Sequence, residues 1–137
     1  MIEFVRTDRY PFELLDSWLK ADPYHQDSNL SYWKPNGKEI LACWIKDKIG
    51  PTMYLKLDTE ARLVRMHVQF APEAEVSKSR VARTILQAWP RIVSLVNIPD
   101  VEGVAFESVS PELVRFMYRM GFREWKEQDY LYSFREK

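Results

Sequence analysis

A strict alternation of apolar and polar residues marks the middle of the chain. Between Arg62 and Phe70, the apolar residues Val64, Met66 and Val68 alternate with polar side chains, which is the period of a strand with one buried face. Two more apolar runs precede this segment, and short turns separate the three. The pattern predicts an antiparallel meander of three strands, at Glu39–Asp47, Thr52–Leu57 and Arg62–Phe70.

Apolar residues at helical spacing mark three other segments. They predict helices at Tyr10–Ala21, at Ser79–Val96 and from Pro111 onward. Pro90 is expected to kink or split the second helix after Trp89, because proline has no N–H to donate and its ring crowds the preceding turn. The third helix has the clearest ends, since Ser110 suits an N-cap and Gly121 suits a left-handed C-cap.

The remaining segments complete one order of elements. A short strand at Ile2–Arg6 opens the chain, and the polar, aromatic-rich segment Tyr24–Lys38 is predicted as a loop. Another strand begins at Gly103, and an extended segment restarts at Phe122 and continues through Asp129–Phe134. The predicted order is β-α-β-β-β-α-β-α-β-β, an α+β fold in a single domain, residues 1–137.

Composition narrows the classes of function. The 137 residues are 46% hydrophobic, and 20 basic and 20 acidic residues give a formal net charge of zero. A globular domain is therefore expected, and nucleic-acid binding is the weakest reading because it needs a basic surplus or patch. Cys43 is the one cysteine, so no intrachain disulfide can form, and with two histidines at unrelated spacing no metal site is predicted.

Neither a targeting signal nor an apolar run of membrane-spanning length is visible in the sequence. A cytoplasmic protein without a membrane partner is the expectation. The oligomeric state is not specified by any pattern in the chain.

The five tryptophans divide into two groups by their neighbours in the sequence. Trp18, Trp44 and Trp89 fall on apolar stripes and are predicted to lie in the core. Trp33 and Trp125 stand among polar residues and are predicted to mark a surface that meets a partner.

The stretch Gly103–Phe122, with its strand, capped helix and Gly-Phe ending followed by two closing strands, resembles the C-terminal half of the GNAT acyltransferase fold. The predicted order of elements extends this resemblance over nearly the whole chain. It implies a mixed, mostly antiparallel sheet with helices on both faces. It also implies that acyl-CoA, most simply acetyl-CoA, lies where the strand Arg62–Phe70 splays from the next strand.

The phosphate-binding turn departs from the family pattern Arg/Gln-x-x-Gly-x-Gly/Ala. Ala82 matches the last position, but Arg80 stands where the first glycine belongs and Ser77 where Arg or Gln belongs. Basic side chains could replace the backbone contacts to phosphate, or they could only form a solvated helix start. The resemblance implies the cofactor-binding set Val68, Phe70, Ser77, Lys78, Ser79, Arg80, Val81, Ala82, Arg83 and Ser110.

The resemblance also implies where the chemistry takes place. Glu107 is the first candidate for a general base and His67 the second, although either could be a structural or solvent-facing residue. Met117 occupies the place of the family's acidic tyrosine, and Tyr118, one residue later, is the candidate for a displaced acid. The loop would face an amine acceptor through four side chains, or else pack on the sheet as a lid: Tyr24, His25, Tyr32 and Trp33.

Two functions follow from the resemblance. The first is an acyl-CoA-dependent N-acyltransferase acting on a small-molecule or protein amine. The second is a catalytically degenerate scaffold that binds a macromolecular partner, similar to GNAT-like chains of tailed phages that are virion-associated or act on host proteins. The first predicts an open cleft between strands ending near Phe70 and Ser108, free amides at Ser79–Ala82, and neither Arg80 nor Trp89 filling the cleft. The second predicts an exposed aromatic patch near Trp33 or Trp125.

Overall fold

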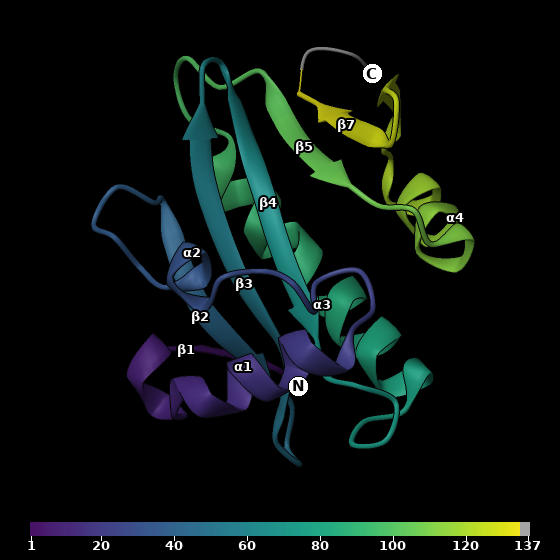
Figure 1. Ribbon diagram of the computed structural model, residues 1–137. Coiled ribbons are helices and arrows are strands. Elements are labelled where there is room, and N and C mark those ends of the chain that lie inside the picture. Colours follow the sequence, from purple (N-terminus) through teal and green to yellow (C-terminus); the bar gives the residue numbers. More distant parts are fainter. Residues whose placement is uncertain (135–137) are drawn as a thin grey trace.

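One seven-stranded sheet, in the order β1-β2-β3-β4-β5-β7-β6, organises the computed structural model, which describes residues 1–134 (Figure 1). The strands are β1 (Glu3–Val5), β2 (Leu41–Lys46), β3 (Pro51–Glu60), β4 (Leu63–Phe70), β5 (Gly103–Glu107), β6 (Arg123–Lys126) and β7 (Asp129–Ser133). The helices are the 3₁₀ turn η1 (Thr7–Arg9), α1 (Phe12–Ala21), α2 (Leu30–Trp33), α3 (Lys78–Val96) and α4 (Pro111–Met120). The predicted order is confirmed, and the short helix α2 lies in the segment predicted as a loop.

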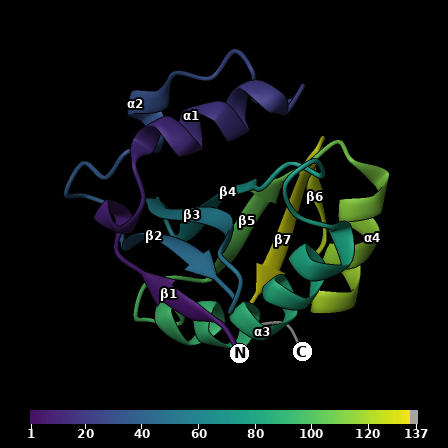
Figure 2. The ribbon, with the colours of Figure 1, turned by 90° about the horizontal axis from the view of Figure 1, so that it is seen from below.

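The helices cover the two faces of the sheet unequally. Helices α1 and α2 lie over one face, and α3 and α4 over the other (Figure 2). On the α1 side, β7 and β6 have no helix above them. The predicted mixed, mostly antiparallel sheet with helices on both faces is therefore confirmed, and it leaves one strip of the sheet open.

All strand pairs are antiparallel except β4 with β5. These two strands pair in parallel over only three residues each, Leu63–Arg65 with Gly103–Ala105. Beyond this point β4 continues to Phe70 and β5 to Glu107 without pairing with each other. The sheet therefore opens between its two halves, and one edge of each strand carries backbone groups that the other does not satisfy.

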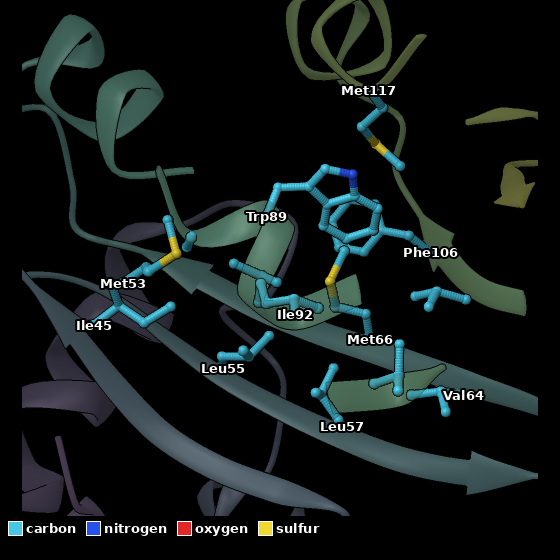
Figure 3. Close-up of a cluster of buried hydrophobic side chains, with 14 of the residues drawn as sticks. Ile45, Met53, Leu55, Leu57, Val64, Met66, Trp89, Ile92, Phe106 and Met117 are labelled. Atoms are coloured by element: carbon cyan, nitrogen blue, oxygen red, sulfur yellow. The ribbon is translucent and has the colours of Figure 1, made fainter. Parts of the chain in front are cut away.

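Two hydrophobic clusters hold the layers together. The larger lies between the sheet and α3 and α4, and Figure 3 shows Trp89 and Met117 of these helices above strand residues such as Met66. The smaller lies under α1 and contains Trp18, Trp44 and Trp33. The core positions predicted for Trp18, Trp44 and Trp89 are confirmed. The surface position predicted for Trp33 is wrong, because its side chain is only 3% exposed.

The ends of α4 follow the sequence signals closely, whereas the proline inside α3 does not act as expected. Ser110 accepts the Leu113 N–H at the start of α4, and Gly121 adopts a left-handed φ of +108° at its end, as predicted. Pro90, by contrast, does not split α3, which is one helix from Lys78 to Val96. The carbonyl that Pro90 leaves without a donor belongs to Leu86, which is on the exposed face, where water can hydrogen-bond to it.

Candidate functional site

A cleft of about 830 Å³ lies where β4 and β5 separate. It is lined by the distal halves of these strands, the first turns of α3 and α4, and the segment between α1 and α2. Neither Arg80 nor Trp89 lines it. Trp89 is instead packed against Phe122 and Tyr132, with ring centroids 5.1 and 5.3 Å away. The cleft that the acyltransferase hypothesis requires is therefore present and open.

Each strand of the cleft follows its antiparallel neighbour. The Ala71 N–H donates to the Thr52 carbonyl at 2.9 Å, which keeps the end of β4 on β3. The Ser108 N–H donates to the Gln128 carbonyl at 3.1 Å, which draws the end of β5 toward β7. Beyond Arg65 and Ala105 each strand therefore keeps its antiparallel neighbour, while the parallel pair between them ends. The cleft is thus a consequence of strand pairing rather than of any one side chain.

The start of α3 forms one end of the cleft. The Ser77 hydroxyl caps the helix by accepting the Arg80 N–H at 3.3 Å, and the Ser77 carbonyl accepts the Val81 N–H at 3.1 Å. Ala82 lies inside the helix, where its N–H bonds to the Lys78 carbonyl, so the expectation of free amides throughout Ser79–Ala82 is wrong for three of the four positions. Helix geometry leaves the amides of Lys78 and Ser79 without an intrahelical acceptor, and the helix dipole still favours an anion here.

Arg80 points away from the cleft. Its guanidinium donates to both carboxylate oxygens of Asp47, at 2.5 and 2.8 Å, with the two side chains 13% and 19% exposed. These bonds hold the pKa of Asp47 well below its usual range. The side chain lines a separate small groove together with Arg83. It is therefore neither a solvated helix start nor, in this conformation, a phosphate ligand of the cleft.

Lys78 bridges the mouth of the cleft at the same end. Its Nζ lies 3.0 Å from a carboxylate oxygen of Glu112, at the start of α4, and 3.0 Å from one of Glu73. All three side chains line the cleft. An anionic ligand at the start of α3 would have to displace one carboxylate from Lys78 and approach the other.

The two candidate bases lie on the same face of the sheet. Arg65 pairs with Ala105, so a period of two places His67 and Glu107 on the same face, the α1 side, just beyond the point where the strands separate. Both line the cleft. His67 Nε2 lies 3.2 Å from Asp58 Oδ2, and burial lowers the pKa of the imidazole although Asp58 opposes the effect. A neutral imidazole is thereby favoured, which is the form that can accept a proton.

His25 belongs to a hydrogen-bonded chain on the acceptor side. Its Nδ1 lies 2.6 Å from Gln69 Oε1 and 3.4 Å from Asp22 Oδ2, and Gln69 Nε2 donates to Asp22 at 3.2 Å. Burial lowers the pKa of His25, but the bonds to Asp22 and Gln69 and the charge of Glu107 outweigh it, so the pKa is raised. Burial raises the pKa of Tyr24, and the negative charge of Glu107 raises it further.

Helix α2 both packs on the sheet and lines the cleft. The Tyr54 hydroxyl donates to the Trp33 carbonyl at 2.6 Å, and the Lys56 Nζ donates to the Tyr32 carbonyl at 2.8 Å. Tyr32 remains 54% exposed and its ring meets the edge of His67, with centroids 5.1 Å apart. Trp33 is buried, and its Nε1 has no hydrogen-bond partner among the described residues. The segment therefore packs on the sheet, as a lid would, and its residues also form part of the cleft wall.

Tyr118 lies outside the cleft. Its hydroxyl donates to Glu124 Oε1 at 3.2 Å, and its ring packs on Tyr130 at the exposed side of α4. Met117, at the family's tyrosine position, is buried in the core. The geometry therefore gives Tyr118 no contact with a ligand in the cleft.

The sequence-predicted residues fall into two groups. Those that line the cleft are Glu107, His67, Val68, Phe70, Lys78, Val81, Ala82, Ser110, Tyr24, His25, Tyr32 and Trp33. Those that do not are Tyr118, Ser77, Ser79, Arg80 and Arg83. The roles of both groups stay predictions.

Sequence reasoning missed several polar residues of the site. Gln69 and Arg65 alternate with the apolar residues of β4, and that pattern could have identified them together with His67. Asp22 had the signature of a helix end only. The carboxylates of Glu73 and Glu112 carried no signal, because their common partner Lys78 is brought to them by tertiary structure.

Comparison with known proteins identifies the fold. No family model matches the sequence, and no curated protein matches it. A chimera of spermidine N-acetyltransferase SpeG from Vibrio cholerae and hSSAT superposes with a TM-score of 0.67 and 13% identity, over 95% of this chain and 92% of that one. An acetyltransferase from Thermus thermophilus gives 0.66 and 14%, over 96% of each chain.

A third solved structure agrees with these two. The ribosomal-protein-S18-alanine N-acetyltransferase of Escherichia coli gives a TM-score of 0.61 and 12% identity, over 92% of this chain and 79% of that one. At such identities the likeness establishes the fold, which is that of the GNAT N-acetyltransferases. Within residues 1–134, no helix is long and apolar enough to cross a membrane.

Proposed function

From this GNAT fold, we propose that the chain is an acyl-CoA-dependent N-acyltransferase. The observation that carries the proposal is the open cleft at the splay of β4 and β5. It is lined by the start of a long helix, which favours an anion, and on the α1 side of the sheet by Glu107 and His67. A thioester entering from the helix end would meet an amine entering from the α1 side between these groups.

The chain's own groups suit the steps of acyl transfer. Glu107, or His67 in its neutral form, takes a proton from the attacking amine. The unpaired edge of β4 near Val68 and Phe70 supplies backbone donors for the pantetheine arm and for the developing oxyanion. Acyl-CoA supplies the activated acyl group: the C–N bond forms, the C–S bond breaks, and the thiolate takes up a proton. Tyr118 is too remote in this conformation to give that proton.

The phosphate end of the cleft fits the cofactor only in part. The dipole of α3 and the Lys78 ammonium favour a pyrophosphate, whereas the carboxylates of Glu73 and Glu112 repel it. Ser77 occupies one amide that the phosphates could use. Binding would require Lys78 to exchange a carboxylate for a phosphate, which is feasible because these side chains are about two-thirds exposed.

Glu107→Gln tests the proposal in a thiol-release assay with acetyl-CoA and a panel of amines. If Glu107 is the base, the rate falls by roughly 10²–10⁴-fold, while the Kd for acetyl-CoA is unchanged. The matched control is Glu127→Gln, an exposed acid outside the cleft, which should retain full activity. A near-normal rate in Glu107→Gln removes this residue from the mechanism and leaves His67 as the candidate.

The departures at the start of α3 favour a second candidate, a GNAT-shaped scaffold that binds a macromolecule. Capped amides and acidic neighbours are what a lineage that no longer binds acyl-CoA would tolerate. An aromatic patch for a partner would include Trp125, which is 36% exposed, rather than the buried Trp33. Failure to bind acetyl-CoA at millimolar concentration, with capture of a specific partner that Trp125→Ala abolishes, would favour the scaffold.

A further inference from the structure

The permanent cations of the cleft are already neutralised. Among residues 1–134, Arg65 and Lys78 are the lysine and arginine side chains that line it. Arg65 donates to Glu60 at 3.0 Å and to Asp129 at 3.3 Å. Lys78 is likewise held between two carboxylates, as described above. Each cation therefore faces two anions, and neither offers an unpaired charge to a ligand.

Glu107 has the opposite character. It is an exposed carboxylate at the end of β5, it lines the cleft, and it forms no ion pair with a basic side chain among the described residues. Arg65, which shares its face of the sheet, is engaged by Asp129 next to it. On the α1 side, the cleft thus offers a ligand the carboxylate of Glu107, whereas the nearby positive charge of Arg65 is already paired.

Two exposed aromatic rings share the cleft with this carboxylate. Tyr24 is 44% exposed and Tyr32 is 54% exposed, and both line the cleft. Tyr32 already receives an ammonium on its ring, since Lys56 Nζ lies 5.5 Å from the centroid. Aromatic faces beside a carboxylate stabilise a cation and give nothing comparable to an anion.

We propose that the acceptor bound here is a cationic amine that carries no carboxylate of its own. This inference rests on the proposed function, because it names the acceptor class of the same cleft. The ammonium pairs with Glu107 between the rings of Tyr24 and Tyr32. A carboxylate on the same molecule would approach Glu107 or Asp22 and would find neither Arg65 nor Lys78 free to neutralise it.

Two pairs of compounds that differ by one carboxylate test this selectivity: tyrosinamide against tyrosine, and agmatine against arginine. Binding is measured by calorimetry on the full chain, alone and with CoA present. In at least one pair, the compound without the carboxylate should bind roughly tenfold tighter or more than its partner, and added salt should weaken its binding. Glu107→Gln should abolish the preference, whereas Glu127→Gln should keep it.

Equal affinities within both pairs would overturn the inference, as would tighter binding of the carboxylate-bearing members. So would the absence of binding by all four compounds with and without CoA. Because binding is measured without acyl transfer, the acceptor site and the acyltransferase activity are tested independently of each other. Selective amine binding with no thiol release from acetyl-CoA would contradict the enzyme and keep the cation site, and the reverse result would keep the enzyme alone.

Discussion

The two histidines of the cleft have opposite environments. His25, although partly buried, is bonded to Asp22 and Gln69, and its pKa is raised. His67 is buried beside Lys56 and Arg65 as well as Asp58, and its pKa is lowered. Environments that separate two like groups in this way assign one to hold a proton and the other to accept one. On the proposed function, His67 suits a base and His25 suits a proton donor or a polar anchor.

Asp22→Asn tests the environment of His25. The substitution should lower the pKa of His25, which can be measured by an NMR titration of its imidazole protons. Since the folded pKa is raised, protonated His25 stabilises the fold fully below about pH 6.5, and this stability is lost as pH rises through the raised value. The free energy of unfolding of wild type should therefore exceed that of the variant by about 1–2 kcal/mol near pH 6, and by less at alkaline pH.

The control for this titration is Asp27→Asn, an exposed acid in the same loop. It should leave both the imidazole titration and the pH dependence of stability almost unchanged. A His25 pKa that does not move in Asp22→Asn would show that the hydrogen-bonded chain does not form in solution.

Single residues were predictable where their signal is local. Ser110 and Gly121 are recognised from neighbours a few positions away, and both ends of α4 lie where these residues predict. Trp33 was assigned to the surface from its polar sequence neighbours, yet it is buried beside Trp18 and Tyr54, which lie far away in the sequence. Burial is decided by tertiary contacts, so the local pattern was misleading there.

At the scale of elements, the bond between Arg80 and Asp47 ties the start of α3 to the turn after β2. Arg80→Gln should lower the free energy of unfolding by about 1.5–3 kcal/mol, measured by denaturant titration. Asp47→Asn should cost a similar amount, and the double variant less than the sum. The affinity for acetyl-CoA should change by less than about twofold, because the side chain lies outside the cleft. A tenfold loss of affinity with unchanged stability would instead assign Arg80 to the phosphates.

The bridge from α3 to α4 through Lys78 makes a different prediction. Glu112→Gln removes one carboxylate that competes with phosphate and repels it. The affinity for acetyl-CoA should rise by about two- to tenfold at low salt, and the gain should shrink as salt is added. Glu127→Gln should have no effect. An unchanged or weaker affinity in Glu112→Gln would show that the pyrophosphate does not reach Lys78.

Elements were easier to predict than their departures from regularity. Periodicity identified the three meander strands and the three long helices, because burial of one face forces that pattern. Pro90 was expected to kink or split α3, and it does not split it, because on an exposed helix face water can satisfy the freed carbonyl. The contacts of Arg80 and Lys78 could not be predicted, since Asp47 and Glu112 are each more than 30 residues away in the chain.

For the whole molecule, the order of elements was sufficient to predict the fold, and the fold positions the cleft. The sheet divides where β4 and β5 stop pairing with each other and keep their antiparallel neighbours, so the position of the cleft follows from the topology. The chemistry of the cleft is not. Its excess of carboxylates and the capped start of α3 emerge only when the loops and helices are in place.

Calorimetry with acetyl-CoA tests most simply whether the cleft between β4 and β5 binds acyl-CoA. Wild type should bind with a micromolar Kd. Ala82→Phe, which fills the cleft, should weaken binding by roughly tenfold or more, whereas Gln87→Phe, in the separate groove on α3, should not. No binding to the folded wild-type protein at millimolar acetyl-CoA would rule out this cofactor site and leave a GNAT fold without its cofactor.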